Sequence, residues 1–391
     1  MNVTVLVSHY LPGFKAGGPV RSIANLVDRL GDEINFHIVA ADRDIGDRQP
    51  YPAAHVGAWQ RVGKAQVMYL PPSRLPPRRL TAIVRDARAD LLYCNGFFNL
   101  STCALPLLLR RLGRLLELPV IIAPRGEFSP GALALKRWKK APYLAAVKSL
   151  GLNRGALWHA TSDLERLDIE RVMDPTARIT VAPNLSSAMV APAVRTEAKR
   201  RGELKLVFLS RIVPKKNFLG ALEILTTVPG RVRLDVWGPL EDPAYWHRCR
   251  RAIEQLPANV AVCHRGALPP DDVQPTLAQY DALLFPTHGE NYGHVIVEAL
   301  AAACPVVISD ATPWRDLQRQ SVGWDLPLAD LAGFRRALAS LADMDEAAHS
   351  QLRRRAARFA QEATQNPADV DASRSLFTAA LGAAPHRRRA A

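Results

Sequence analysis

The stretch ALLFPTHGENYGHVIVEALAAACPVVI, residues 282–308, contains two apolar runs separated by a glycine-containing turn and a helical pattern. The first run is Ala282–Phe285 and the second is Val306–Ile308, and both have the length and composition of buried strands. A strand, a helix and a further strand in this order predict a parallel sheet. Glu290 and Glu298 lie eight positions apart across the turn, at the sheet edge where open α/β folds bind ligands.

Two interpretations of these glutamates are open at this point. A carboxylate at the carboxyl end of a parallel sheet suits the hydroxyls of a sugar or a ribose, because charged acceptors form stronger hydrogen bonds. Acidic residues also gather at helix N-termini for purely structural reasons, because they interact favourably with the helix dipole. Features elsewhere in the sequence are needed to distinguish these two interpretations.

Short apolar runs alternate with helical patterns along almost the whole chain, which predicts an α/β fold with helices on both faces of doubly wound parallel sheets. In the first half the expected strands are residues 3–8, 35–40, 66–70, 90–94, 119–123, 156–160 and 178–182. The helices expected between them are residues 19–30, 78–88, 100–116, 131–150 and 162–173. Further along the chain, the expected strands are residues 204–209, 232–236, 259–263, 282–285 and 305–308.

The alternation is interrupted at residues 186–203, where Ser, Ala, Pro, Arg and Lys dominate and a linker is predicted. We therefore expect two Rossmann-like doubly wound domains, residues 1–185 and residues 204–365, that face each other across a cleft. Ligands favour clefts of this kind.

The 391 residues are 48% hydrophobic and 23% charged, which is typical of globular domains with sizeable cores. The N-terminus enters a strand at once, without the features of a secretory signal, and no apolar run is long enough to span a bilayer. Five cysteines are scattered without a C-x-x-C spacing, which favours buried thiols in a reducing compartment over a metal or redox site. These features predict a cytoplasmic protein.

The net charge of +14 is concentrated in the segment 136–148, which begins Lys-Arg-Trp-Lys-Lys. Such a segment could contact anionic lipid headgroups or nucleic acid, and a solvated helix face explains it equally well. The chain contains none of the usual nucleic-acid-binding motifs, so we do not expect a nucleic-acid partner. Contact with an anionic membrane surface would make the protein peripheral on the inner face of the plasma membrane.

A glycine-rich turn follows the first expected strand. Gly17 and Gly18 would allow close approach of the backbone to a ligand, and Pro19 suits the first turn of the following helix. The free N–H groups at a helix start attract phosphate. A plain loop is the alternative.

The corresponding turn of the second domain contains Arg211 and Lys216, just after the strand 204–209. Cations at this edge of the sheet would hold a diphosphate and oppose the charge that grows on it as it leaves. One charge-assisted contact of this type is worth roughly 1.5–3 kcal/mol. Solvated surface cations are the alternative.

Two further turns carry charged side chains. Arg125 and Glu127 follow the strand 119–123 and could meet an acceptor, although a structural Arg–Glu pair is an equal alternative. Ser162 and Glu165 have the spacing of a capping box, and we expect them to cap a helix.

Two D-x-D sequences, Asp42-Arg43-Asp44 and Asp343-Met344-Asp345, have the form that can bind a divalent metal holding a nucleotide diphosphate. Neither lies beside the cation or glutamate sites, and we expect no metal and no other cofactor.

Taken together, these segments resemble family 4 of the glycosyltransferases, retaining enzymes of the GT-B fold. The resemblance covers nearly the whole chain, and its strongest feature is the Glu-x7-Glu motif formed by Glu290 and Glu298. Within the family, the chain looks most like bacterial enzymes of exopolysaccharide, capsule or lipopolysaccharide assembly. The other matching segments are Gly17–Pro19, Pro124–Gly126, His159–Ser162, Ser210-Arg211, Lys216-Asn217 and Pro286–Pro305.

The resemblance implies a role for each of these residues. Arg211 and Lys216 would bind the donor diphosphate, and Gly17 and Gly18 would approach it from the other domain. Catalysis would rest on Arg211, Lys216 and Glu290. The rest of the donor site would consist of Glu298 on the ribose, Gly266 and Ala267 near the base, and Asn291, Tyr292 and Gly293. A last helix, at about residues 366–381, would cross back to the first domain.

The implied reaction transfers a hexose from a nucleoside diphosphate sugar to a hydroxyl of a saccharide, with lipid-linked or oligosaccharide acceptors. The family usually needs no metal. Some relatives carry a histidine or an aspartate at the acceptor side, where Arg125 and Glu127 are the nearest candidates in this chain. The alternatives are another GT-B enzyme, such as a nucleotide-sugar epimerase or a phosphorylase, a basic nucleic-acid-binding protein, and a non-catalytic scaffold.

Overall fold

The computed structural model describes residues 1–72, 75–115, 118–186 and 195–382. The chain divides into two compact units, one formed by Met1–Ser187 with Pro367–Ala391 and the other by Ala188–Asn366. Within the described ranges, no helix combines the length and the apolar character needed to cross a membrane.

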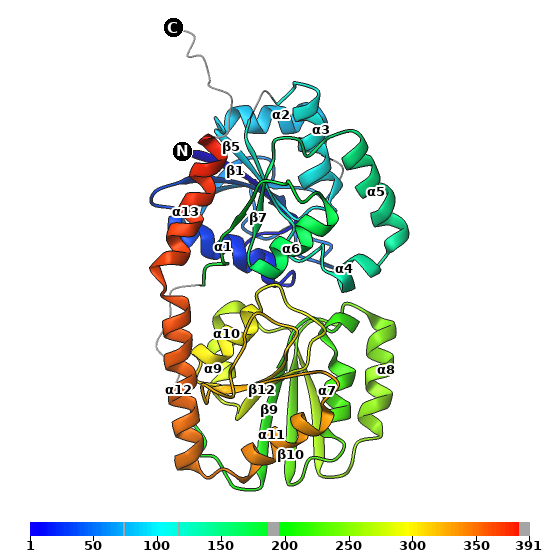
Figure 1. Ribbon diagram of the computed structural model, residues 1–391, viewed down its shortest axis with the longest axis vertical. Helices are drawn as coiled ribbons and strands as arrows, with labels where there is room; N and C mark the ends of the chain where they lie inside the picture. The colour runs from blue at the N-terminus through cyan, green and yellow to red at the C-terminus, as the bar shows by residue number, and fades with distance from the viewer. Residues whose placement is uncertain (73–74, 116–117, 187–194, 383–391) are drawn as a thin grey trace. The chain divides into compact units, whose positions relative to one another are not determined.

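The described residues of the first unit form a sheet with the strand order β3-β4-β2-β1-β5-β6-β7-β8. Figure 1 labels β1, β5 and β7 among these strands. Neighbouring strands are parallel, except that β3 pairs antiparallel with β4. The strands are β1 (Asn2–Leu6), β2 (Asn35–Ala41), β3 (Trp59–Val62), β4 (Ala65–Leu70), β5 (Leu91–Asn95), β6 (Val120–Ala123), β7 (Leu157–Ala160) and β8 (Ile179–Val181). The helices are α1 (Gly18–Leu30), α2 (Pro77–Asp86), the π-helical turn η1 (Leu100–Ala104), α3 (Leu105–Arg111), α4 (Pro130–Ala134), α5 (Arg137–Ser149), α6 (Asp163–Val172) and α13 (Pro367–Gly382).

Helices cover both faces of this sheet because successive side chains of a strand point to opposite faces. In β5, Leu91 and Tyr93 enter the core cluster that contains residues of α1 and α13. Leu92 and Cys94 enter a second cluster, with residues of α2 and α3. The sheet is therefore doubly wound, as the continuous apolar runs predicted.

Helix α13 completes the first unit, although it comes from the end of the chain. The Phe377 ring centroid lies 5.9 Å from that of Phe36 and 6.0 Å from that of Tyr93. The Arg374 guanidinium donates to both carboxylate oxygens of Glu33, at 2.6 and 2.7 Å. The first unit is thus built from two separate parts of the sequence.

The second unit has the strand order β11-β10-β9-β12-β13-β14, and all its pairings are parallel. Helix α7 contacts α8 and α11, whereas α10 contacts α9 and α12 (Figure 1). The strands are β9 (Glu203–Leu209), β10 (Arg231–Trp237), β11 (Val260–Gly266), β12 (Ala282–Phe285), β13 (Val306–Ser309) and β14 (Gly323–Leu326). The helices are the 3-10 turn η2 (Pro214–Lys216), α7 (Phe218–Leu225), α8 (Pro243–Glu254), α9 (Pro270–Leu277), α10 (His294–Ala301), α11 (Leu331–Asp343) and α12 (Glu346–Thr364).

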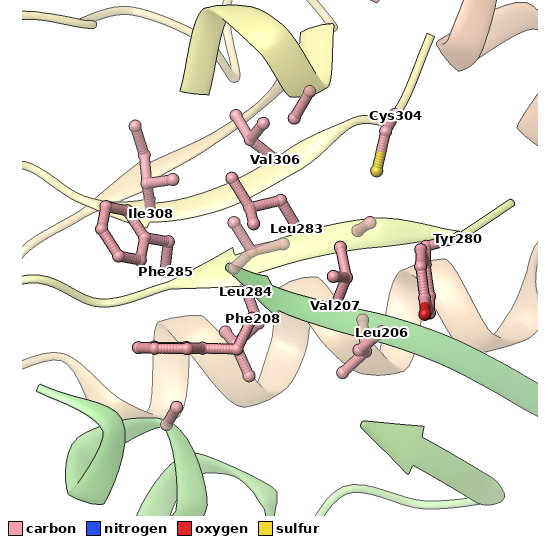
Figure 2. Close-up of a cluster of buried hydrophobic side chains, with 14 of the residues drawn as sticks. Leu206, Val207, Phe208, Tyr280, Leu283, Leu284, Phe285, Cys304, Val306 and Ile308 are labelled. Atoms are coloured by element: carbon pink, nitrogen blue, oxygen red, sulfur yellow. The ribbon is translucent and has the colours of Figure 1, made fainter. Parts of the chain in front are cut away.

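The core of the second unit is centred on β9, β12 and β13. Val207, Leu283 and Val306 are fully buried there, and Figure 2 shows side chains of these three strands in one cluster. The ring centroids of Phe208 and Phe285 are 5.6 Å apart. Burial of one such side chain stabilises the fold by about 1.5–3 kcal/mol, so the two strands that carry the site loops are firmly anchored.

All the strands expected from the sequence are present, and the prediction of two doubly wound α/β domains is confirmed. Strands β3 and β14 were not predicted. Both are short edge strands in which few side chains are buried, so they lack the apolar run that marks an interior strand.

Two helix predictions were wrong in detail. The single helix expected at 131–150 is two helices, α4 and α5, because Leu135 is extended and Lys136 adopts a left-handed conformation. The helix expected at 100–116 begins with the π-helical turn η1 and ends at Arg111. In the predicted linker, residues 187–194 lie outside the described residues, and the strand β9 already begins at Glu203.

Candidate functional site

The strand order of the second unit reverses between β9 and β12, and such a switch point is where doubly wound sheets bind ligands. The turn after β9 carries Lys216, and the loop after β12 carries Glu290. The Lys216 ammonium forms an ion pair with the Glu290 carboxylate, and their side chains are only 15% and 13% exposed. The structure thus brings together two of the residues expected to be catalytic.

The geometry of this pair follows from how the two loops are joined. The His288 N–H donates to the Lys215 carbonyl at 2.9 Å, and the Thr287 hydroxyl donates to the same carbonyl at 3.1 Å. Asn217 has a left-handed backbone and caps α7, accepting from the Gly220 N–H at 3.2 Å. Its amide donates to the Pro286 carbonyl at 2.8 Å. These hydrogen bonds between uncharged groups join the two loops in addition to the ion pair.

Glu290 is held by further contacts. Its backbone N–H donates to the Ala311 carbonyl at 3.1 Å, and the Thr287 hydroxyl lies 3.3 Å from its carboxylate. Lys216 is also positioned over the Phe285 ring, with its ammonium 5.5 Å from the ring centroid. A largely buried cation next to a carboxylate can bind the anionic part of a ligand, while the carboxylate accepts hydrogen bonds from hydroxyl groups beside it.

Arg211 lies in the loop after β9 but has a different partner. Its Nη1 donates to Glu241 Oε2 at 2.8 Å, and their side chains are 34% and 38% exposed. Glu241 follows β10, the neighbour of β9 in the sheet. Both predicted cations are thus paired with carboxylates.

The other residues predicted for the donor site lie at and just after the end of β11 and on the elements that follow β12. Gly293 has a left-handed backbone and is the N-cap of α10, and a Cβ there would lie 2.8 Å from the Ile296 side chain. The Tyr292 carbonyl accepts from the Trp314 indole at 2.6 Å. Asn291 and Tyr292 are half-buried in the same loop, and Glu298 is half-buried within α10. Gly266 ends β11, its carbonyl accepts from the Gly238 N–H at 2.7 Å, and Ala267 next to it is exposed.

The glycine-rich turn of the first unit also follows the strand next to a switch point, between β1 and β5. Gly17 has a left-handed φ of 69° and precedes α1, which Gly18 begins. A Cβ at Gly17 would meet no atom within 4 Å, so the turn needs this glycine for its backbone conformation. The Asp44 carboxylate fixes the turn by accepting from Phe14 and Lys15 N–H groups at 2.7 and 2.9 Å.

Arg125 is at the centre of a largely buried network. Its guanidinium donates to Asn95 and Asn184, at 2.7 and 2.5 Å, and to the Tyr93 hydroxyl at 2.7 Å. The Tyr93 hydroxyl also lies 2.7 Å from Nδ1 of His159. These contacts make Arg125 a structural centre of the first unit in this structure, and its acceptor-side role stays a prediction.

His159 is neutral in this network. Its Nε2 lies 2.8 Å from the Ala182 carbonyl and must donate to it, so Nδ1 accepts from the Tyr93 hydroxyl. Burial, with a contribution from the Arg125 charge, lowers the pKa of His159 to about 3. Burial also raises the pKa of Tyr93 to about 12.

Glu127 lies in the loop after β6. Its Oε2 accepts from the N–H groups of Phe97 and Phe98, at 2.6 and 3.1 Å. Burial raises the pKa of this carboxyl, although those two hydrogen bonds and the charge of Lys140 act in the opposite direction. The arrangement differs from a simple Arg–Glu pair, since Arg125 and Glu127 have separate partners.

The capping box prediction was half right. The Ser162 hydroxyl accepts from the Glu165 N–H at 3.2 Å, as expected for a cap. The Glu165 carboxylate instead accepts from the N–H groups of Thr161 and Gly126, at 2.8 and 2.6 Å. Glu165 therefore joins the start of α6 to the turn that carries Arg125 and Glu127.

The D-x-D acids have structural partners. Asp42 is paired with the adjacent Arg43 at 2.7 Å, and Asp44 fixes the glycine-rich turn. Asp345 caps α12 by accepting from Ala348 N–H at 2.9 Å. Across the described ranges, no group of three or more His, Cys, Asp or Glu side chains is arranged to hold a metal ion.

Sequence reasoning missed Glu241 and the loop-joining role of Thr287. A signal for Glu241 was available: β10 neighbours β9 in a doubly wound sheet, so the loop after β10 must lie beside Arg211. Thr287 had no such signal, because its role depends on a contact with the Lys215 carbonyl that only the folded loops create.

Comparisons with known proteins agree with this architecture. A family model described as a glycosyl transferase 4-like domain matches residues 17–185, and one described as glycosyl transferases group 1 matches residues 193–360. The D-inositol 3-phosphate glycosyltransferase of Geodermatophilus obscurus is 28% identical over 232 residues, which are 53% of this chain. The chain spans about half the length of that relative, since the match covers 48% of it.

Solved structures are similar over nearly the whole chain. Sucrose-phosphate synthase from Thermosynechococcus elongatus has a TM-score of 0.70 at 14% identity, with 96% of this chain and 99% of that chain covered. Anabaena HepE in complex with UDP-glucose has a TM-score of 0.65 at 16% identity, with 96% and 98% covered. WaaG, a glycosyltransferase involved in lipopolysaccharide biosynthesis, has a TM-score of 0.61 at 13% identity, with 97% and 98% covered. The chain belongs to the family 4 glycosyltransferases and has the GT-B fold.

Proposed function

We propose that the protein transfers a hexose from a nucleoside diphosphate sugar to a hydroxyl of a saccharide acceptor, with retention of the anomeric configuration and without a metal ion. The pathway would be the assembly of a bacterial surface polysaccharide. The observation that carries the proposal is the ion pair of Lys216 and Glu290 at the β9/β12 switch point.

Binding of the donor would replace the contact between Lys216 and Glu290 with contacts between each of them and the donor. When the diphosphate binds Lys216 and Arg211, the Glu290 carboxylate is released to accept hydrogen bonds from hydroxyls of the donor sugar. Glu298 would accept from the ribose hydroxyls, and the backbone at Gly266 and Ala267 would lie against the base. From the first domain, Gly17 and Gly18 would contribute backbone N–H groups to the phosphates.

In the reaction, the bond between the anomeric carbon and the diphosphate oxygen breaks, and a bond to the acceptor oxygen forms. Negative charge grows on the departing diphosphate, where Lys216 and Arg211 oppose it. The proton of the acceptor hydroxyl passes to an oxygen of the departing diphosphate as the new bond forms. On the acceptor side, Glu127 is the better candidate to interact with that hydroxyl, because Arg125 already has three hydrogen-bond partners.

The acceptor would be a lipid-linked saccharide or an oligosaccharide. The exposed start of α5 supports a membrane-bound acceptor: Trp138 is 74% exposed and Leu135 is 54% exposed, beside the cations Lys136, Arg137 and Lys139. Apolar side chains among cations suit the interface of an anionic membrane. The protein would then act in the cytoplasm, peripherally on the inner face of the plasma membrane.

A thermal-shift panel of UDP-, GDP-, ADP- and TDP-sugars tests the proposal, because a ligand that binds only the folded state raises the apparent stability. UDP-glucose is the first donor to test, since the HepE structure contains it. We expect the sugar donor of one base to raise the melting temperature. When that donor carries a label in its sugar, we expect the label to be transferred to a saccharide acceptor. Conversion of the labelled donor without any acceptor would instead indicate an epimerase, and phosphate-dependent release would indicate a phosphorylase.

A further inference from the structure

The ion pair between Arg211 and Glu241 differs from that between Lys216 and Glu290. One nitrogen of the Arg211 guanidinium contacts one oxygen of Glu241, at 2.8 Å, and both side chains are about one-third exposed. Within the described part of the chain, neither side chain forms another hydrogen bond or ion pair. The contact is therefore single, solvated and easily broken.

The two loops nevertheless keep the carboxylate close to the guanidinium. The Ser210 N–H donates to the Trp237 carbonyl at 3.0 Å, and the Ile212 N–H donates to the Pro239 carbonyl at 2.9 Å. A Cβ at Gly238 would lie only 1.8 Å from the Ser210 carbonyl oxygen, so the backbones touch where only glycine fits. Because this junction lies next to both residues, Glu241 stays beside Arg211 whether or not their side chains are in contact.

We propose that Glu241 holds Arg211 in the donor-free protein and competes with the donor diphosphate for its guanidinium. The inference rests on the proposed function, in which Arg211 binds that diphosphate. An arriving diphosphate must displace the carboxylate from the guanidinium, and the loss of that contact lowers donor affinity. Once the sugar has been transferred, the return of Glu241 to Arg211 favours release of the nucleoside diphosphate.

Two other roles for Glu241 predict different effects. A carboxylate that orients Arg211 for the ligand would strengthen donor binding. A carboxylate that accepts from the ribose, as acids after the second strand of a dinucleotide-binding sheet do, would strengthen the binding of the nucleoside itself. Only competition predicts that removing the charge tightens binding, and only for ligands that carry phosphate.

The experiment is calorimetry on the full chain, with UDP, GDP, ADP and TDP as probes and with the nucleoside of the tightest-binding diphosphate as comparison. For Glu241→Gln, we expect the Kd of that diphosphate to fall about two- to fivefold, which is the range expected for removal of a partly exposed ion pair. The Kd of the nucleoside should not change. Glu254→Gln makes the same change of net charge at the exposed far end of α8 and should leave both values unchanged.

Arg211→Ala separates failure of this inference from failure of the proposed function. We expect that variant to bind the diphosphate more weakly and to gain nothing from added Glu241→Gln. If Arg211→Ala weakens binding but Glu241→Gln leaves it unchanged or weaker, the competition is refuted and the proposed function stands. Wild-type affinity in Arg211→Ala would overturn this inference and the role of Arg211 in donor binding. A wild-type protein that binds none of the four diphosphates would overturn the proposed function.

Discussion

Lys216 and Glu290 are separated by 74 positions in the sequence, yet their side chains form one ion pair at the carboxyl ends of β9 and β12. The hydrogen bonds that the Lys215 carbonyl and the Asn217 side-chain amide form with the 286–288 segment hold the two loops together. A cation and an anion are thereby fixed in adjacent positions, as a ligand with both phosphate and hydroxyl groups requires.

The first prediction concerns the leaving group. Lys216→Ala should lower kcat at saturating donor by on the order of 10²–10³, as loss of one preorganised charge-stabilising donor does. Steady-state kinetics with the donor found in the thermal-shift panel measure this. Arg231→Ala removes an exposed cation at the opposite, amino end of β10 and should keep wild-type kcat.

Stability has to be controlled in that test, because Lys216→Ala leaves the Glu290 carboxylate without its cation. The double variant Lys216→Ala/Glu290→Gln has no unpaired carboxylate at this position and should unfold close to the wild-type temperature. Wild-type turnover in a folded Lys216→Ala protein would refute the leaving-group role.

The second prediction concerns the ribose. Glu298→Ala should raise the Kd of the nucleoside diphosphate about 10- to 100-fold, the equivalent of roughly 1.5–3 kcal/mol for a hydrogen bond to a charged acceptor. Calorimetry with the ribose and 2′-deoxyribose forms of the nucleotide measures it. The contact is supported if the variant loses the preference for ribose, and an unchanged Kd contradicts it.

The third prediction distinguishes the structural role of Arg125 from an acceptor-side role. Arg125→Lys should lower the free energy of unfolding of the first unit by about 1–3 kcal/mol, because an ammonium cannot replace the three-way guanidinium contacts and leaves a buried polar group unpaired. Arg137→Lys, in the exposed first turn of α5, is the matched control. Chemical denaturation that leaves Arg125→Lys as stable as wild type, with lowered acceptor affinity, would favour the acceptor role instead.

The fourth prediction is a pH dependence. The pKa of His159 is about 3 in the folded protein and 6.5 as an isolated group, so acid protonates the unfolded chain first. Its contribution to stability is complete above pH 6.5 and is lost as the pH falls towards 3, by about 2 kcal/mol between pH 7 and pH 5. His159→Gln keeps a donor and an acceptor but cannot titrate. We expect denaturation curves of that variant to lose this part of the pH dependence, and an equal slope would contradict the assignment.

The fifth prediction concerns the membrane. Trp138→Ser, and separately Lys136→Glu with Lys139→Glu, should reduce co-sedimentation with anionic liposomes, because they remove the apolar and the electrostatic parts of the interaction. Binding of the wild type should weaken as salt rises. Arg319→Glu with Arg336→Glu, at exposed positions of the second unit, makes the same change of net charge as the double lysine variant and should not affect pelleting. Absence of wild-type pelleting at low salt would end the membrane proposal.

The interior strands could be predicted from sequence because each is a continuous apolar run, as β12 and β13 illustrate. The edge strands β3 and β14 could not, since one partner strand and partial exposure leave no such run. The break at Lys136 was also hidden, because a lysine in a left-handed conformation carries no sequence signal of the kind that glycine gives.

The candidate site was predictable to the level of which residues follow which strand. Placing Lys216 and Glu290 on neighbouring strand ends follows from the order of the sheet. The order of the sheet also places the loop of Glu241 beside Arg211, but the contact between these two side chains depends on the paths of the loops. Arg125 illustrates the same limit: its position after β6 was foreseen, but not its three partners, of which Tyr93 and Asn95 lie on β5 and Asn184 lies after β8.

The bidentate contact of Arg374 with Glu33, and the packing of Phe377 against Phe36 and Tyr93, have a consequence for biosynthesis. Residues 1–186 are synthesised well before α13, so apolar side chains near Phe36 stay uncovered until α13 has been made. The incomplete first unit should therefore bind chaperones while the second unit is being synthesised. A chimera that exchanges donor specificity between relatives would need two splice junctions, one near residue 187 and one near residue 366, because a single junction would separate α13 from its own docking surface.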